Sequence, residues 1–225
     1  TEGLSNQILN EGQRKTFETK KQVNLSYKDH DMARYRVNIY RQNDTVALVF
    51  RKVETKISTI KELNLPEILS ELSGTRQGLI LVTGPTGCGK SSTLAAMIEY
   101  RNSKEAGHII TIEDPIEFLH SSKMSIISQR EIGTDVESFS DGLRDALRQA
   151  PDMILIGEMR DEDSAQQAIY FAETGHLVLS TLHSVNAGQT LERILQFFPA
   201  DRHSQILMLL SLNLKAIISQ KLVPR

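Results

Sequence analysis

The stretch GLILVTGPTGCGKSSTLAAMIEYRN, residues 78–102, decides the fold of this chain. Its apolar run 79–82 predicts a buried strand, its glycine-rich segment 84–91 predicts a loop, and the Ala- and Leu-rich residues that follow predict a helix. The loop has the spacing G-x-x-x-x-G-K-S. Its glycines let successive backbone N–H groups point at a polyphosphate, and the positive end of the next helix adds to that field. The stretch therefore predicts a P-loop that binds a nucleoside triphosphate.

The side chains of the loop have separate predicted tasks. Lys90 is expected to reach the β- and γ-phosphates, and the hydroxyl of Ser91 is expected to hold Mg²⁺. The predicted nucleotide-binding residues are Gly84, Pro85, Thr86, Gly87, Cys88, Gly89, Lys90, Ser91 and Ser92.

Composition indicates an ordinary globular protein. The 225 residues are 40% hydrophobic and 24% charged, with a formal net charge of −2, which allows one large domain or two small ones. No run approaches the roughly 18 apolar residues that a spanning helix needs. The single Cys88 excludes an internal disulfide and suits a reducing cytosol. Because the first residue is Thr and no signal peptide is evident, we expect a fragment or a processed start.

The N-terminal part, residues 1–53, predicts a small α+β domain. The pattern indicates one helix followed by three antiparallel strands, at residues 4–21, 23–27, 33–40 and 45–53. Arg36 and Arg51 alternate with apolar residues, so we expect them on the polar face of this sheet, where solvated side chains are the simplest interpretation.

A linker and a longer α/β domain follow. Residues 54–62 are polar without a period and predict an interdomain linker, and residues 63–225 form the second predicted domain. Its first helix is expected at 63–72, with Pro66 in the first turn. Strands and helices then alternate, which predicts a mainly parallel sheet covered on both faces. The expected strands are 79–82, 108–112, 124–128, 153–156 and 177–182, and the expected later helices are 138–149, 161–173 and 201–220.

Acidic residues follow two of these strands. Glu113 and Glu117 lie just after strand 108–112, at the edge where an α/β sheet keeps its chemistry. Strand 153–156 runs into Glu158, which is typical of a Walker B acid acting on Mg²⁺ or water. Glu113 and Glu117 are candidate water activators, with helix capping or a structural role as the alternative.

Four segments resemble the motifs of one ATPase superfamily, in order and in spacing. They are the Walker A loop with ITIEDPIEF (110–118), SQRE (128–131), LRDALRQAPDMILIGEMRD (143–161) and ETGHLVLSTLH (173–183). They resemble the Walker A, Asp box, Walker B and His box of the secretion-superfamily ATPases. The QRE and ETGH tracts favour the type IV pilus retraction branch, the PilT/PilU family, and 197–224 with 63–69 favours its PilU-like members.

The resemblance implies a fold and an assembly. It implies a PAS-like N-terminal domain, truncated here, and a RecA-like ATPase domain whose C-terminal helices are missing after Arg225. It also implies a homo-hexamer, or a mixed ring with a related retraction ATPase. Such a ring would use ATP and Mg²⁺ and release ADP. It would work in the cytoplasm against an inner-membrane pilus platform protein, without inserting into the membrane, to drive retraction and twitching motility.

The resemblance also implies residue roles. It favours Glu117 as the water activator and makes His176 and His183 candidate γ-phosphate sensors, although either histidine could simply close a hydrogen bond at a strand end. Under it, Arg36 and Arg51 would close onto the nucleotide. Arg144 and Arg148, four residues apart on one expected helix, would form a second arginine pair, with surface salt bridges as the alternative.

Other functions stay open from the sequence. A type II secretion or pilus-assembly ATPase of the same superfamily is one alternative, and a regulatory ring subunit with little turnover is another. A nucleic-acid motor should show a basic, aromatic-studded groove. The chain has no Trp and 5% aromatic residues, so nucleic acid is not an expected partner.

Overall fold

The computed structural model describes residues 2–30 and 33–223. The chain divides into two compact units, Thr1–Glu54 and Thr55–Arg225. Each unit has its own buried apolar core.

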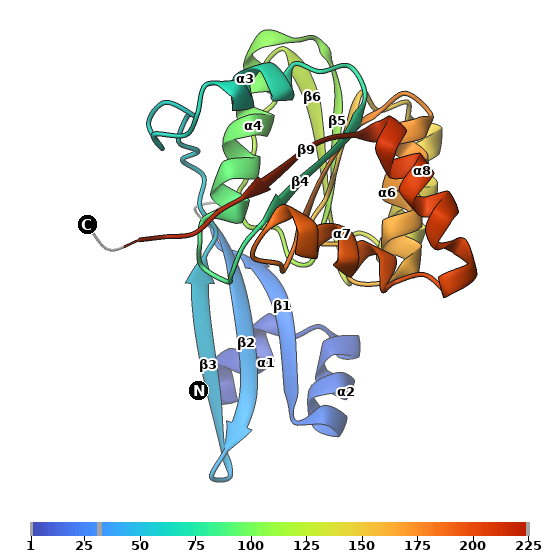
Figure 1. The fold of residues 1–225 in the computed structure, drawn as a ribbon. Coiled ribbons are helices and arrows are strands. Elements are labelled where there is room, and N and C mark those ends of the chain that lie inside the picture. Colours follow the sequence, from blue (N-terminus) through green and yellow to red (C-terminus); the bar gives the residue numbers. More distant parts are fainter. Residues whose placement is uncertain (1, 31–32, 224–225) are drawn as a thin grey trace. The chain divides into compact units, whose positions relative to one another are not determined.

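The first unit is a three-stranded antiparallel meander with two helices on one side (Figure 1). Its elements are α1 (Glu2–Ile8), α2 (Glu11–Lys20), β1 (Gln22–Lys28), β2 (Arg34–Gln42) and β3 (Thr45–Lys52). Phe17 of α2 packs with Val37 and Ile39 of β2, while Arg36 alternates with these buried residues. The predicted α+β unit and the placement of the arginines opposite the core are confirmed.

The single helix expected at 4–21 is wrong, because the chain breaks at Asn10. This residue has an extended backbone and caps α2, accepting a hydrogen bond from the N–H of Gln13 at 2.8 Å. The side chain of Gln13 accepts from the N–H of Asn10 in return at 3.1 Å. This reciprocal capping box starts a new helix inside a polar stretch that has one continuous pattern.

The second unit is built on a six-stranded sheet in the order β6-β5-β7-β8-β4-β9. Every pairing in it is parallel, which confirms the mainly parallel sheet. Its strands are β4 (Gly78–Thr83), β5 (Gly107–Glu113), β6 (Ser125–Glu131), β7 (Met153–Ile156), β8 (Leu177–Leu182) and β9 (Leu214–Ser219). The carboxyl ends of β4, β5, β7 and β8 therefore meet at one edge.

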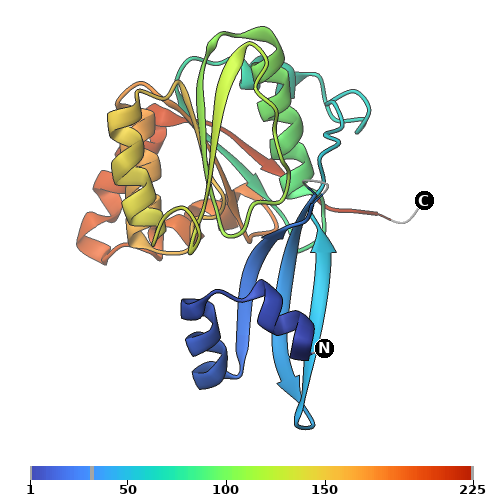
Figure 2. The same ribbon diagram turned by 180° about the vertical axis from the view of Figure 1, so that it is seen from behind.

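Helices cover both faces of this sheet (Figures 1 and 2). The helices are α3 (Ile68–Ser73), α4 (Lys90–Lys104), α5 (Phe139–Ala146), α6 (Glu162–Glu173), α7 (Ala187–Leu195) and α8 (His203–Asn213). Ile80 and Val82 of β4 pack with α3 and α4, whereas Leu79 and Leu81 pack with α5 to α8. This alternation along one apolar strand is what a sheet buried on both faces requires.

The expected helix 201–220 is partly wrong. Residues 200–202 form a 3₁₀ turn and 203–213 form α8, but 214–219 form β9 beside β4. The helical spacing of apolar residues continues through this tract, yet pairing with an open edge of the sheet overrides it. Helix α7, which the sequence pattern does not predict, begins at Ala187 and is capped by Asn186, whose side chain accepts from the N–H of Gln189 at 2.9 Å.

The segment before the P-loop also differs from expectation. The helix expected at 63–72 is reduced to α3, because Asn64 takes a left-handed conformation (φ 52°) and Pro66 disfavours a helical residue before it. The expected linker 54–62 packs against the second unit near its C-terminal end. Ile60 is 6% exposed and belongs to the core beside α4.

Among the described residues, no helix has both the length and the apolar character needed to cross a membrane.

Candidate active site

The P-loop connects β4 to α4 at the carboxyl edge of the sheet. Gly84, Gly87 and Gly89 have φ angles of 147°, 79° and 97°, which disfavour side chains. The ammonium group of Lys90 is nearly buried and donates to the carbonyl oxygens of Gly84 at 2.9 Å and Pro85 at 3.2 Å. The positive charge is thus held inside the loop.

The end of β9 supports this loop from the neighbouring strand. A Cβ atom on Gly84 would lie 2.3 Å from the carbonyl oxygen of Gln220 and 2.6 Å from Sγ of Cys88. The N–H of Gln220 donates to the carbonyl of Thr83 at 2.8 Å, and its side chain donates to Oγ1 of Thr93 in α4 at 2.7 Å. Of the other loop residues, Pro85, Thr86 and Gly87 are exposed, and Ser91 and Ser92 are half-buried.

The two acids after β5 have different environments. Glu113 is 8% exposed and accepts from the Thr111 hydroxyl at 2.7 Å and from the Gln129 amide at 3.2 Å. Burial raises the pKa of its carboxyl, and these hydrogen bonds, with one from the N–H of Glu117, oppose the rise. Glu117 is exposed. The exposed acid is the one that solvent water can reach.

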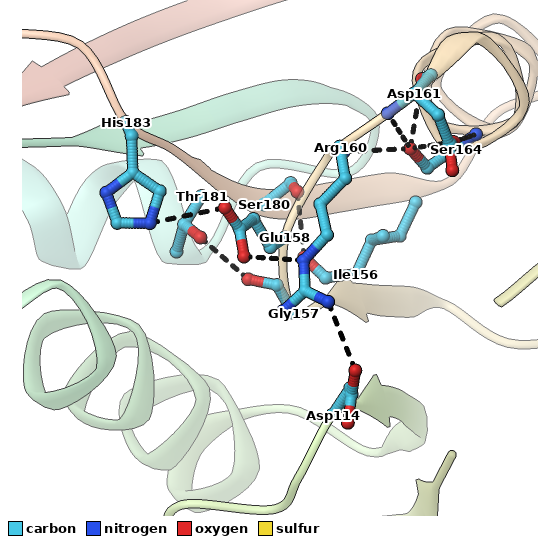
Figure 3. A network of polar contacts seen from close by, with 10 residues as sticks. All are labelled: Asp114, Ile156, Gly157, Glu158, Arg160, Asp161, Ser164, Ser180, Thr181 and His183. Atoms are coloured by element: carbon cyan, nitrogen blue, oxygen red, sulfur yellow. Dashed lines mark hydrogen bonds and ion pairs between the residues drawn. The ribbon is translucent and has the colours of Figure 1, made fainter. Parts of the chain in front are cut away.

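Glu158 follows β7 and is held from both sides (Figure 3). Its Oε2 accepts from Nε of Arg160 at 2.8 Å, and its Oε1 lies 3.2 Å from Nε2 of His183, which follows β8. The hydroxyl of Thr181 binds the carbonyl of Gly157 at 2.8 Å, which fixes the backbone just before the acid.

Arg160 joins the acids of two strands. Besides Glu158, its Nη1 donates to Oδ2 of Asp114 at 3.1 Å (Figure 3). The hydrogen bond that Arg160 donates to Glu158 raises the pKa of the guanidinium most; burial lowers this pKa, and the charges of Glu158 and Asp114 raise it further. This cation keeps two carboxylates close together at the edge where the P-loop lies.

Magnesium chemistry is compatible with the residues present. Within the ranges 2–30 and 33–223, no group of three His, Cys, Asp or Glu residues is arranged to bind a metal ion. Nucleotide-bound Mg²⁺ requires less, because phosphate oxygens and waters fill most of its coordination sphere. The hydroxyl of Ser91 and the carboxylate of Glu158 are oxygen ligands of the right kind.

Two of the predicted catalytic residues, His176 and Arg148, lie away from this edge. His176 precedes β8, roughly 20 Å from its carboxyl end at the usual rise per residue, and its Nδ1 lies near the Thr174 hydroxyl and the Phe171 carbonyl. It closes hydrogen bonds at a strand end, which agrees with the alternative of a structural role, and its role as a γ-phosphate sensor stays a prediction. Arg148 adjoins Gln149, whose carbonyl binds His108 at the amino end of β5.

Arg144 and Arg148 do not share one α-helix face. Helix α5 ends at Ala146 and residues 147–149 form a 3₁₀ turn, because Ala150 is left-handed (φ 47°). Both arginines are exposed, and Arg144 pairs with Asp141 at 3.6 Å. The Arg144–Asp141 pair matches the surface salt-bridge alternative.

Arg36 and Arg51 belong to the first unit and lie directly opposite each other. They are Cα partners in the register of β2 and β3. Like charges directly opposite one another destabilise a sheet. This arrangement therefore creates a local concentration of positive charge on the face that carries no helix.

The sequence analysis assigned no role to Asp114, Arg160 or Gln129. Asp114 stands between the two named acids, and Arg160 follows Glu158 by two residues, so proximity to the motifs was an available signal. The sequence signal for Gln129 was weaker, because its contacts with Glu113 depend on the parallel pairing of β5 and β6.

A parallel sheet whose first strand ends in a glycine loop with a buried lysine, and whose neighbouring strands end in acids, defines the P-loop nucleotide-hydrolase class. The family described as Type II/IV secretion system protein matches residues 35–225. The chain belongs to this family.

Curated relatives and solved structures place it more closely. The type IV pilus ATPase PilU of Pseudomonas aeruginosa is 52% identical over 96% of this chain and 57% of its own length. PilT, the type IV pilus retraction ATPase of that organism, is 46% identical over 97% and 63%. The crystal structure of the pilus retraction motor PilT with bound ADP covers 99% of this chain and 65% of that one, with a TM-score of 0.95 and 45% identity. The chain thus spans about three fifths of these relatives.

Proposed function

We propose that this chain is the nucleotide-binding and catalytic part of an ATP-hydrolysing motor that powers type IV pilus retraction and twitching motility. The observation that carries the proposal is the buried Lys90 inside a glycine loop, at the same edge of the sheet as the acids that follow β5 and β7. The similarity to PilU and PilT supports ATP as the nucleotide and the pilus as the load.

Phosphate binding rests on the P-loop. The ammonium of Lys90 donates hydrogen bonds to carbonyl oxygens of the loop, and it would exchange these for hydrogen bonds to phosphate oxygens of ATP or ADP. The backbone N–H groups of residues 84–92 and the N-terminus of α4 supply the remaining field. Mg²⁺, when bound, neutralises developing charge on the phosphates, and Ser91 and Glu158 are the residues that would hold it.

Water activation rests on an acid at the same edge. Glu117 is exposed and one short loop from β5, so it can accept a proton from a water molecule near the γ-phosphate. Glu113 is buried and hydrogen-bonded, which suits support rather than proton transfer. Glu158 would orient water or metal. His183, in contact with Glu158, would report the γ-phosphate to β8.

Force requires more than one subunit. The proposed assembly is a homo-hexamer, or a mixed ring with a related retraction ATPase, in the cytoplasm beside an inner-membrane platform protein of the pilus. In such a ring Arg36 and Arg51 would close onto the nucleotide. His176 and Arg148, which lie away from the site of their own chain, would act only on a neighbouring subunit's nucleotide, and Arg144 would act with Arg148 as the second arginine pair.

Turnover measured against protein concentration, with mass determination at each point, tests this proposal. We expect ATP hydrolysis per subunit to rise steeply where a species of six subunits forms. Turnover that is constant across a monomer-to-ring transition would remove the ring from the mechanism. A chain that binds ATP without measurable turnover in any assembled form would favour a regulatory subunit instead.

A further inference from the structure

Strand β6 carries two side chains that bind the loop between β5 and β6, residues 114–120. The register places Gln129 beside Thr111 and Glu131 beside Glu113, at the edge of the sheet where the acids lie. Neither side chain is close to the P-loop in sequence. Both nevertheless hold the segment that contains Glu117.

Gln129 uses all the hydrogen-bonding groups of its amide. Its Nε2 donates to Oε1 of Glu113 at 3.2 Å and to the carbonyl oxygen of Phe118 at 2.9 Å. Its Oε1 accepts from the N–H of His120 at 2.8 Å. A glutamine amide offers two N–H donors and one carbonyl acceptor, so this one side chain is well matched to three partners.

Glu131 holds the same loop two residues earlier. Its side chain is 3% exposed, and its Oε2 accepts from the N–H of Ile116 at 3.1 Å. Its Oε1 accepts from the Thr134 hydroxyl at 3.3 Å. A buried carboxylate that bonds a backbone N–H is costly to displace, because the N–H group would lose its partner away from water.

Together the two side chains bind backbone groups at every second position, 116, 118 and 120. The residue between the first two is Glu117, which is exposed while Ile116 is buried. Because the backbone is fixed on both sides of Glu117, the orientations available to its carboxylate are restricted. In the described part of the chain, residues 114–120 belong to none of the named helices and strands, and these side chains supply hydrogen bonds to their backbone.

We propose that Gln129 and Glu131 are positioning residues that hold the loop after β5 so that the carboxylate of Glu117 faces the reacting water. This inference deepens the proposed ATP hydrolysis and rests on it. It adds that catalytic geometry depends on the edge strand β6. Misplacement of a catalytic group by about 1 Å costs up to about 100-fold in rate, so the loss of these bonds should be visible in turnover.

The test is Gln129→Met in the full-length protein, which keeps the length of the side chain and removes its hydrogen bonds. We expect kcat to fall by about 10- to 100-fold, while the Kd for ATP, measured with Mg²⁺ present, stays within about twofold because the P-loop is untouched. Arg130→Met is the matched control. Arg130 is the next residue on β6 and pairs with Asp145 at 3.4 Å, so its loss should change kcat by less than about twofold.

The same substitution in a Glu117→Gln background separates positioning from general destabilisation. If Gln129 acts through Glu117, its removal there should cost less than about twofold more, because groups that act as a unit are not additive. An equal fold-loss in both backgrounds, or wild-type kcat in Gln129→Met, would overturn the inference.

Two further measurements keep the outcomes distinct. Gln129→Glu retains the acceptor for the N–H of His120 and loses both donors, so it should show the same selective loss of kcat even where Gln129→Met folds poorly. A full-length wild type that binds ATP without hydrolysing it would instead contradict the proposed function, whatever the variants do.

Discussion

Glu113 and Glu117 lie four residues apart, and burial separates their chemistry. Glu113 has its oxygens occupied by Thr111, Gln129 and the N–H of Glu117. A carboxylate with three donors cannot readily turn to a water molecule, whereas an exposed one can. The sequence places both acids at the strand end and leaves the choice between them open, because the pattern contains no information on β6.

Glu117→Gln keeps the size of the side chain and loses its basicity. We expect ATP to bind normally and turnover to fall by about 100-fold or more, as for the loss of a general base. Glu113→Gln is the comparison, measured in the same steady-state assay and by equilibrium binding. If Glu113→Gln alone shows normal binding with lost turnover, the wrong carboxylate has been assigned.

His120 is a second residue whose environment predicts a measurable effect. Burial lowers the pKa of its imidazole to about 4, although Glu99 opposes the shift. Between about pH 4 and the ordinary histidine pKa of about 6.5, the imidazole of His120 is therefore protonated in the unfolded chain and neutral in the folded chain. The free energy of unfolding is therefore unaffected by His120 above this pH window, and it decreases as the pH falls through the window.

His120→Leu removes this titration. Between pH 7 and pH 5, the free energy of unfolding of the second unit should decrease in the wild type by about 2 kcal/mol more than it does in the variant. Urea unfolding at the two pH values measures the difference. Equal pH dependence in both proteins would mean that His120 is accessible to protons in the folded state.

At the scale of elements, the strand–loop–helix at 78–102 is predictable because its pattern is local. β4 ends at Thr83, and the helix begins at Lys90. The antiparallel meander is predictable for the same reason. β9 is not, because its spacing is helical and only the open edge of β4 gives it a strand partner. The break at Asn10 is also missed, since a capping box in a polar run resembles continuous helix.

The contact between β9 and the P-loop predicts a difference between two glycines. Gly84→Ala would place Cβ 2.3 Å from the Gln220 carbonyl, so we expect a loss of at least about 2 kcal/mol in stability. At Gly87 nothing lies within 4 Å of an added Cβ, and Gly87→Ala should cost about 1 kcal/mol for its left-handed backbone. Thermal unfolding of both variants tests this order. Equal losses would show that β9 does not press on the loop.

At the scale of the whole molecule, the candidate site combines residues within local sequence motifs and residues that only the fold brings together. The P-loop and the acids were predictable from motifs. The clustering of Asp114, Arg160, Glu158 and His183 required three parallel strands to end at one edge. The position of His176 at the amino end of β8 has the same origin, because a motif on both sides of one strand spans two opposite edges of the sheet.

Arg36 and Arg51 belong to the unit that lacks the P-loop, so any contribution to turnover depends on the two units acting together. We expect Arg36→Ala and Arg51→Ala each to lower ATP turnover by about 10-fold or more, while ADP, which lacks the γ-phosphate, binds as before. Arg41→Ala is the control, since Arg41 stacks on Phe17 on the opposite side of the sheet. Unchanged turnover in both variants would leave the arginines as solvated surface.

The most direct test of the central claim is steady-state ATP hydrolysis by the full-length protein with Mg²⁺, compared with Lys90→Ala. The buried ammonium is the one cation inside the glycine loop among residues 84–92. Its loss should leave the β- and γ-phosphates unpaired and reduce turnover by about 100-fold or more, with weaker nucleotide binding. A Lys90→Ala protein that hydrolyses ATP at the wild-type rate would contradict the assignment of this loop as the site of catalysis.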